Sequence, residues 1–88
     1  MTNQYPAVAY SITVRAEYPN QPGMLGRIAS TVGKAGGDIG AIDIVESTRD
    51  YMVRDITINA RDVAHGQKLA ERIRSLKGVR VMNVSDPT

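Results

Sequence analysis

The sequence contains no cysteine, no tryptophan and no phenylalanine, and aromatic residues make up only 5% of its 88 residues. Without cysteine, the chain can form neither a disulfide framework nor a thiolate metal site. No apolar run approaches the roughly 20 residues that span a bilayer, and the start "MTNQYPAVAY" lacks the basic and apolar regions of a signal peptide. We therefore expect a cytoplasmic protein whose fold depends on packing alone.

A strong excess of charge of either sign is also missing. Eleven Lys and Arg residues face nine Asp and Glu residues, which leaves a net charge of +2, and the basic residues are scattered along the chain. This distribution argues against a nucleic-acid-binding surface. An RNA-recognition module needs aromatic side chains on its central strands, where only Tyr10 and Tyr51 are candidates, and Tyr10 falls on the predicted core face. We therefore expect neither nucleic acid nor membrane as a partner.

What the sequence does contain is the pattern of one small packed domain. Hydrophobic residues make up 42% of the chain, which is ordinary for a globular protein. Alternation of apolar and polar residues, or enrichment in β-forming residues, predicts strands at residues 8–18, 38–47, 51–60 and 79–85. Arg49 and Asp50 form the predicted hairpin turn. We expect residues 1–7 to be a tail and residues 8–86 to be the domain.

Two further segments show the periodicity of amphipathic helices. The apolar stripe of the first helix consists of Leu25, Ile28, Ala29 and Val32, and that of the second consists of Leu69, Ala70, Ile73 and Leu76. Gly36 and Gly37 are the expected stop of the first helix. Asp62 is the expected N-cap of the second helix, and Gly78 is its expected end.

The order strand, helix, strand, strand, helix, strand predicts an α+β fold, the ferredoxin-like βαββαβ sandwich. In this fold a four-stranded antiparallel sheet carries both helices on one face. The strand at residues 38–47 is left at an edge, and the sequence offers no proline or evident bulge to protect it. We therefore expect this strand to pair with another subunit in a homo-oligomer.

No catalytic constellation is evident, so we expect neither an active site nor a cofactor or metal in this chain. The only histidine, His65, has no second imidazole or thiol with which to share a metal, and we predict that it lies on the surface. No evident acid or base partner accompanies the carboxylates of Asp38, Asp43, Glu46, Asp50 and Asp55. The string "GKAGGDIG" closes a helix and opens a strand, which is the reverse of a phosphate-binding loop.

The segment "YPNQPGMLGR", residues 18–27, connects the first predicted strand to the first predicted helix. Pro22 and Gly23 stand at the helix entrance, where unpaired backbone N–H groups and the positive end of the helix dipole favour an anion. Asn20 adds an amide that both donates and accepts hydrogen bonds, which suits the mixed charges of an amino acid. The alternative is that Asn20 caps the helix or shapes the turn, and that Gly23 only permits it. The residues of the loop leave both interpretations open.

The stretch "YPNQPGMLGRIASTVGKAGGDIGAIDIVES" resembles the first half of an ACT domain, the small regulatory module of many enzymes of amino-acid metabolism. The shared features are an Asn two residues before Pro-Gly, an apolar-Leu helix start, a helix closing in Gly, and an Asp-Ile strand start. The later stretches "YMVRDITINARD" and "GVRVMNVSD" fit the rest of the family pattern. The resemblance implies that two subunits pair through the edge formed by the second strand and bind a small effector at the seam.

The resemblance also implies a set of ligand-binding residues, namely Tyr18, Asn20, Gln21, Pro22, Gly23, Met24, Leu25, Asp38 and Ile39. Asn20 and the backbone of residues 21–24 match the loop that holds the ligand, and Tyr18 matches its rim. Asp38 matches the residue that reaches across from the neighbouring subunit. Asn is familiar at that place, and a carboxylate there attracts a ligand's ammonium group and repels its carboxylate.

The function that this resemblance implies is regulation. The domain would bind an amino acid or a related carboxylate, dimerise, and control a linked metabolic enzyme allosterically. The sequence has no nicotinamide fingerprint and no cluster of metal-binding carboxylates, so any catalytic activity would belong to residues beyond Thr88. The alternative function is a structural oligomerisation domain that binds no ligand.

Overall fold

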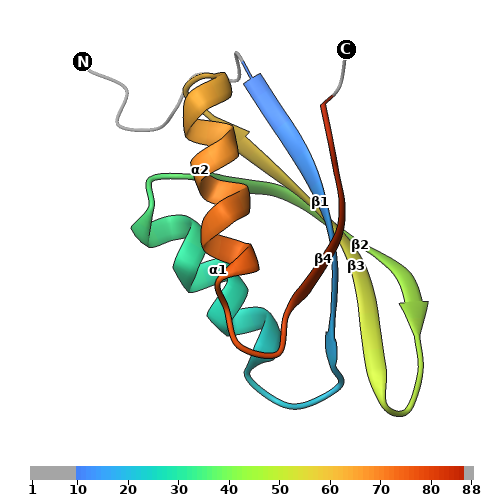
Figure 1. The fold of residues 1–88 in the computed structure, drawn as a ribbon. Helices are drawn as coiled ribbons and strands as arrows, with labels where there is room; N and C mark the ends of the chain where they lie inside the picture. Colours follow the sequence, from blue (N-terminus) through green and yellow to red (C-terminus); the bar gives the residue numbers. More distant parts are fainter. Residues whose placement is uncertain (1–9, 87–88) are drawn as a thin grey trace.

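The computed structural model of the protein describes residues 10–86. Its elements follow the order strand, helix, strand, strand, helix, strand (Figure 1). They are β1 (Tyr10–Pro19), α1 (Met24–Lys34), β2 (Asp38–Ser47), β3 (Tyr51–Ala60), α2 (Val63–Arg74) and β4 (Arg80–Ser85). The four predicted strands and both predicted helices are therefore confirmed. The predicted tail of residues 1–7 and the first two residues of the predicted strand lie outside the described residues.

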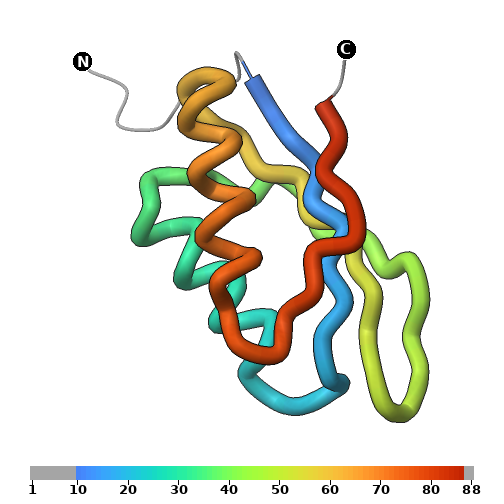
Figure 2. The backbone as a smooth tube through the Cα atoms, viewed as in Figure 1, coloured from blue at the N-terminus to red at the C-terminus, as the bar shows by residue number. Residues whose placement is uncertain are grey.

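The strands form one antiparallel sheet in the order β2-β3-β1-β4, so β2 and β4 are its two edges. Both helices cover the same face of this sheet (Figure 1), which confirms the ferredoxin-like sandwich. The turn between β2 and β3 and the loop between β1 and α1 lie at the same end of the molecule (Figure 2). This shared end is where the sequence predicts the ligand loop.

The helix-facing side of the sheet forms the core. In β1, buried residues alternate with half-buried ones, and the buried set is Ile12, Val14, Ala16 and Tyr18. The helices contribute fully buried side chains, among them Ile28, Val32, Leu69 and Ile73. Polar pairs such as Thr13 opposite Thr57 lie on the other face. The two faces therefore follow the alternation of the sequence.

The prediction that His65 lies on the surface is wrong. Only 4% of His65 is exposed, and its Nδ1 atom accepts a hydrogen bond from the backbone N–H of Arg61 at 3.1 Å. Its Nε2 atom must therefore carry the ring proton, which it donates to the backbone oxygen of Ala35 at 2.8 Å. His65 joins the end of α1 to the start of α2, a contact between residues far apart in the sequence.

The ends of the helices bear out most of the predicted signals. The carboxylate of Asp62 accepts a hydrogen bond from the backbone N–H of His65, which confirms Asp62 as the N-cap of α2. Gly36 has φ 83 directly after the last residues of α1, which confirms the glycine stop. The end of α2 differs from the prediction, because the helix ends at Arg74. Gly78, with φ 85, belongs to the turn that leads into β4.

The edge strand β2 also differs from the prediction. Its register against β3 shifts twice, between Ile39 and Ala41 and between Ile44 and Glu46. The strand therefore carries irregularities that the sequence did not reveal, and such bulges increase the local twist of an edge. No helix in the described part of the chain is long and apolar enough to cross a membrane.

Candidate functional site

The loop between β1 and α1 is fixed to the β2–β3 turn by Asn20. The side-chain amide of Asn20 donates a hydrogen bond to the backbone oxygen of Thr48 at 2.9 Å, and its backbone N–H donates to that of Asp50 at 3.0 Å. Asn20 is nevertheless exposed, as are Gln21, Pro22 and Gly23. Its side-chain oxygen is therefore available to a ligand, while its amide group holds the loop in place.

The start of α1 has no side-chain cap. Gly23 is the N-cap residue with φ 88, no side chain bonds to the first turn, and the first turn contains no acidic residue. The alternative in which Asn20 caps this helix is therefore wrong, whereas Gly23 does permit the turn, because a positive φ disfavours a side chain. Within residues 10–86, the backbone N–H groups of Leu25 and Gly26 have no hydrogen-bond acceptor. Such groups and the helix dipole favour an anion.

A shallow depression of about 480 Å³ begins at this helix start. It is lined by Gly23, Gly26, Arg27, Ser30, Thr31, Lys34 and Leu76. Two of these side chains are cationic and none is acidic, so the lining also favours a negative group. The side chain of Met24 points into the core, and that of Leu25 packs against the core. These two predicted site residues therefore offer mainly their backbone to a ligand.

The structure does not bring Asp38 and Ile39 together with the loop in one chain. Asp38 begins β2 and accepts a long hydrogen bond from the side chain of Asn59 at 3.5 Å. Asn20 contacts Thr48, just past the other end of the same strand. Nine residue steps along a strand correspond to about 30 Å. Asp38 can approach an Asn20 loop only if that loop belongs to a second chain.

The edge strand β2 is exposed along almost its whole length, Ile39 alone being half-buried. Its exposed large apolar side chains are those of Ile42, Ile44 and Val45, and Ile44 is 61% exposed. An edge strand with exposed apolar residues is a typical surface for association.

Arg54 is a residue of this region that sequence reasoning missed. It lies on β3 and donates a hydrogen bond from Nε to the hydroxyl of Tyr18 at 2.7 Å. Tyr18 itself is only 4% exposed, so its side chain offers almost no surface to a ligand. A charged residue at a core-facing position would be its signal, but Met52 and Val53 are consecutive apolar residues, so the sequence does not show which face of β3 points to the core.

The next residue of β3, Asp55, differs from Arg54 in that its charge is paired. On the other face of the sheet, Arg15 donates two hydrogen bonds to the Asp55 carboxylate, from Nε at 2.8 Å and from Nη2 at 2.9 Å. These hydrogen bonds lower the pKa of Asp55 below its ordinary value. Arg15 and Asp55 therefore satisfy each other.

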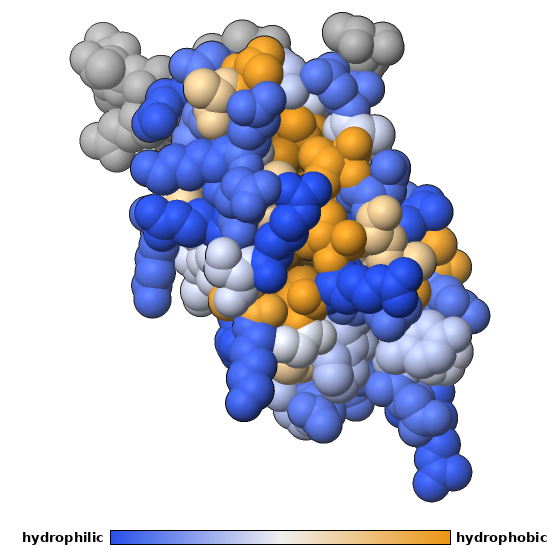
Figure 3. Space-filling model, in the orientation of Figure 1, coloured by the Kyte–Doolittle hydropathy of each residue, from blue (hydrophilic) through white to orange (hydrophobic). Residues whose placement is uncertain are grey.

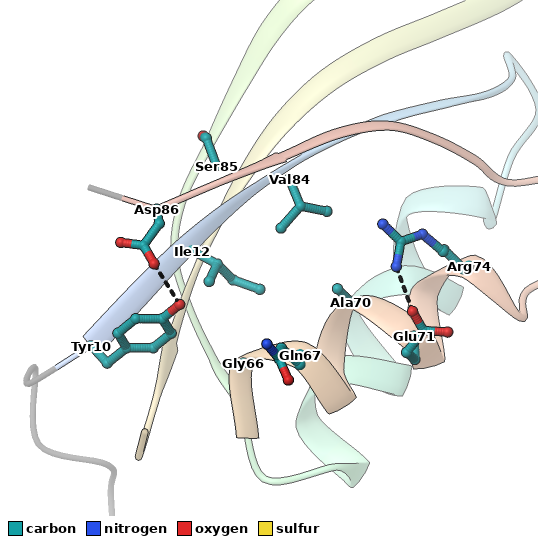
Figure 4. A pocket seen from close by; sticks show the side chains of 10 residues that line it. All are labelled: Tyr10, Ile12, Gly66, Gln67, Ala70, Glu71, Arg74, Val84, Ser85 and Asp86. Atoms are coloured by element: carbon teal, nitrogen blue, oxygen red, sulfur yellow. Dashed lines mark hydrogen bonds and ion pairs between the residues drawn. The ribbon is translucent and has the colours of Figure 1, made fainter. Parts of the chain in front are cut away.

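A groove of about 440 Å³ lies far from the loop, between α2 and the strands β1 and β4 (Figure 4). Hydrophobic side chains show at the surface between α2 and β4 (Figure 3), and Ile12, Ala70 and Val84 line the groove. At one end, the hydroxyl of Tyr10 donates a hydrogen bond to Asp86 at 2.8 Å, which raises the pKa of Tyr10. The sequence did not predict this groove, because elements distant in the sequence form it.

Metal-binding chemistry finds no support in residues 10–86. No three His, Cys, Asp or Glu side chains in that range gather closely enough to hold a metal ion.

Comparison with known protein families gives one clear match. A family model described as the ACT domain matches residues 6–83, which is most of the chain. This agrees with the resemblance carried by the loop and by the start of β2.

Two curated proteins are similar over most of this chain. The NAD-dependent malic enzyme of Geobacillus stearothermophilus is 39% identical over 80 residues, and NAD-dependent malic enzyme 1 of Bacillus subtilis is 36% identical over 75 residues. The matches cover 91% and 84% of this chain but only 17% of each relative. The sequence pattern itself looks like the ACT domain at the N-terminus of bacterial NAD-dependent malic enzymes. The two relatives confirm the likeness to malic enzymes, and the N-terminal position stays a prediction.

A solved structure has the same fold. The crystal structure of the ACT domain from the GTP pyrophosphokinase of Chlorobium tepidum superposes with a TM-score of 0.67 at 17% sequence identity. The superposition covers 88% of this chain and 96% of that one. At this identity, the likeness establishes the arrangement of strands and helices.

Proposed function

This chain belongs to the ACT domain family, a family of regulatory, ligand-binding modules, and from that premise we propose that it binds a small effector and controls a linked metabolic enzyme. The effector is an amino acid or a related carboxylate. The observation that carries this proposal is the uncapped start of α1, where no acidic residue competes with an anionic ligand. The two relatives suggest that the linked enzyme is an NAD-dependent malic enzyme.

The proposed effector site needs two copies of the chain. We propose that β2 pairs antiparallel with β2 of a second copy, which continues the sheet and covers Ile42, Ile44 and Val45. Pairing about the centre of the strand sets Asp38 of one copy opposite Ser47 of the other. Because Asn20 is held at Thr48, Asp38 of the second copy then lies beside the loop. The exposure of β2 and the position of Asn20 support this arrangement.

Closure of such a seam around an effector also supplies a means of control. An effector that contacts both copies stabilises the assembled arrangement relative to any other, and coupling of this kind is typically worth about 1–3 kcal/mol. We propose that residues 8–86 form the regulatory unit, that residues 1–7 precede it as a tail, and that the protein acts in the cytoplasm.

Effector binding is tested on the full-length protein in its assembled state. Amino acids and dicarboxylates are added singly, and the melting temperature is measured as a function of their concentration. We expect at least one compound to raise the melting temperature as mass action requires. Calorimetry then gives the stoichiometry, for which we expect one effector for each loop. If no compound in either class binds, the proposed effector site does not exist.

Pairing through β2 is tested by a charged residue at each edge of the sheet. Ile44→Lys places an ammonium group on the proposed seam. Met82→Lys makes the same kind of change on β4, where Met82 is 44% exposed. We expect Ile44→Lys to dissociate the oligomer in light-scattering measurements and Met82→Lys to leave it intact. The opposite result would assign the interface to β4.

A second candidate function is assembly without a ligand. The exposed apolar residues of β2 favour it, since they need only a partner strand. Substitution of Asn20 by Ala separates the two functions, provided that oligomeric state is measured together with regulation. Loss of regulation in an intact oligomer supports the effector site, whereas unchanged regulation and assembly support the structural role. Thr48→Ser, which keeps the backbone oxygen that Asn20 contacts, is the matched control.

A further inference from the structure

Arg54 is a charged residue on the core-facing side of a central strand. The register of the sheet places it beside Ala16 of β1 and Ile44 of β2. Met52 and Ile56, two positions away on the same face of β3, are buried. Arg54 is half-buried. Arginine is rarely removed from water without a partner for its charge, so this position requires a reason.

The charge of Arg54 has no counter-ion among residues 10–86. No ion pair involves it there, and its one side-chain hydrogen bond goes to the neutral hydroxyl of Tyr18. Arg15 provides the contrast, because this equally half-buried arginine of the neighbouring strand donates two hydrogen bonds to the carboxylate of Asp55. Of these two half-buried arginines, Arg15 is therefore paired with a carboxylate and Arg54 is not, within the described residues.

The hydrogen bond to Tyr18 orients Arg54 rather than neutralising it. Tyr18 is buried in the core, so its hydroxyl is a fixed acceptor for Nε. A guanidinium group has five N–H donors in a planar fork. With Nε held, the two terminal nitrogens keep the geometry that binds a carboxylate through two parallel hydrogen bonds.

Arg54 also lies next to the proposed seam. Along β1, Tyr18 is followed two residues later by Asn20, the first residue of the ligand loop. On its other side, Arg54 neighbours Ile44 of the exposed edge strand β2. The guanidinium group is therefore positioned between the loop and the edge strand that a second copy would cover.

We propose that Arg54, oriented by the Tyr18 hydroxyl, binds the carboxylate of the effector at the seam together with the open start of α1, and that this effector also carries an ammonium group. This inference rests on the proposed function. Its chemistry follows from two opposite charges, since Arg54 attracts a carboxylate and Asp38 of the second copy attracts an ammonium group. A dicarboxylate without an ammonium group would be repelled by Asp38.

The experiment uses the full-length assembled protein and the standard L-amino acids as probes. For each amino acid that raises the melting temperature, two matched compounds are tested, one without the amino group and one with the carboxylate converted to an amide. We expect both to bind at least tenfold more weakly, because each leaves one charged group of the site unpaired. Equal binding of the compound without the amino group would overturn the assignment of an amino acid.

Arg54→Met and Arg80→Met are then compared by calorimetry. Met keeps much of the length of Arg54 without its charge, and Arg80 is an exposed arginine on the other edge strand. We expect Arg54→Met to raise the dissociation constant of the amino acid about tenfold or more, and Arg80→Met to leave it unchanged. Equal affinity of Arg54→Met and the wild type would overturn the role of Arg54 while the proposed function stands. If the wild type binds no probe, the proposed function itself fails.

The stability of the unliganded protein distinguishes a binding role from a structural one. Arg54→Met removes a charge that has no counter-ion, but it also leaves the buried Tyr18 hydroxyl without its hydrogen-bond partner. Because these effects oppose each other, we expect Arg54→Met to melt close to the wild type. A lower melting temperature, with unchanged affinity, would make Arg54 a structural residue. Tyr18→Phe is the second variant and keeps the buried ring. It should fold and bind the amino acid several-fold more weakly, and full affinity in this variant would exclude the orienting role of Tyr18.

Discussion

The two helices begin in opposite ways, although each follows a strand in the same kind of strand-helix-strand unit. At the start of α2, the side chain of Asp62 accepts a hydrogen bond from the N–H of His65, and both ring nitrogens of His65 are bonded in turn. At the start of α1, Gly23 offers no side chain and no acidic residue follows it. One helix start is satisfied within the chain, and the other is left open.

A second pair of neighbours repeats this difference. Arg15 is satisfied by Asp55, while Arg54 on the opposite face of the same strands has no anion within residues 10–86. The open start of α1 and Arg54 are both close to the loop between β1 and α1, whereas the capped start of α2 is far from it. Unsatisfied groups in a native protein tend to gather where function requires them. We therefore interpret the start of α2 as a structural contact between the helices, and the open start of α1 supports the proposed effector site.

The largest expected effect on stability comes from removing His65, whose hydrogen bonds hold the start of α2. His65→Ala leaves the N–H of Arg61 and the oxygen of Ala35 without their partner in a partly buried place and removes a buried side chain. We expect a loss of about 2–4 kcal/mol in the free energy of unfolding. Urea unfolding measures it as a lower midpoint at an unchanged slope. Gln67→Ala, an exposed change on the same helix, is the control and should alter stability by less than about 0.5 kcal/mol.

His65 also shows where sequence reasoning stops. The elements themselves could be predicted, because alternation in β1 and the stripes of the helices are local patterns that burial imposes on the sequence. The bonds of His65 to Arg61 and Ala35 depend on how the end of α1 meets the start of α2, which no local pattern records. A lone histidine near a helix start therefore looked like a surface residue, although it is 4% exposed.

In the candidate site, too, some residues could be predicted from local sequence patterns and others could not. Asn20 and Gly23 could be found from the sequence, because turn residues before a helix are a local signal. Arg54 could not, because Met52 and Val53 are both apolar and both buried, which hides which face of β3 points to the core. The sequence did not reveal the bulges of β2 for a related reason. The residues of β2 favour strands on both faces, so no break in alternation marks the register shifts.

A smaller loss should follow from removing the cap of α2 alone. Asp62→Ala deletes the acceptor for the N–H of His65 but keeps the imidazole in place. We expect a loss of about 1 kcal/mol, within the range of about 0.5–2 kcal/mol for such caps, measured by thermal unfolding. Asp62→Asn retains an acceptor oxygen and should recover most of the stability. No loss in Asp62→Ala would show that this helix start does not depend on its cap.

Adding a negative charge to the first turn of α1 should raise the stability of the protein, whereas the two preceding substitutions lower it. Gly26 is exposed in the first turn of α1, and a side chain there meets no atom within 4 Å. We expect Gly26→Gln to stabilise the protein by about 0.5–1 kcal/mol through helix propensity. Gly26→Glu should add about 0.3–1 kcal/mol through the helix dipole.

The matched pair at Gly26 also tests the function of the open start. If the start of α1 binds an anion, Gly26→Glu should weaken effector binding, because its carboxylate competes for the same amides, whereas Gly26→Gln should weaken it less. Calorimetry on the full-length protein measures the difference. Equal affinities for the two variants would mean that the charge at this helix start plays no part in binding.

The smallest expected effect on stability comes from breaking the ion pair between Arg15 and Asp55. Because Arg15 lowers the pKa of Asp55, the ionised carboxylate is favoured by folding, so its stabilisation is complete above the unfolded-state pKa of about 4. That stabilisation is lost as pH falls through the lower folded-state pKa. We expect Asp55→Asn to melt slightly below the wild type at neutral pH, and the gap to close as the pH falls below about 4. The effect is small because 43% of the Arg15 side chain is exposed to water. If the difference in melting temperature between the wild type and Asp55→Asn stays constant down to the lowest pH, Asp55 contributes through packing and not through its charge. The contrast between a charge-paired Arg15 and an unpaired Arg54 would then have no energetic meaning.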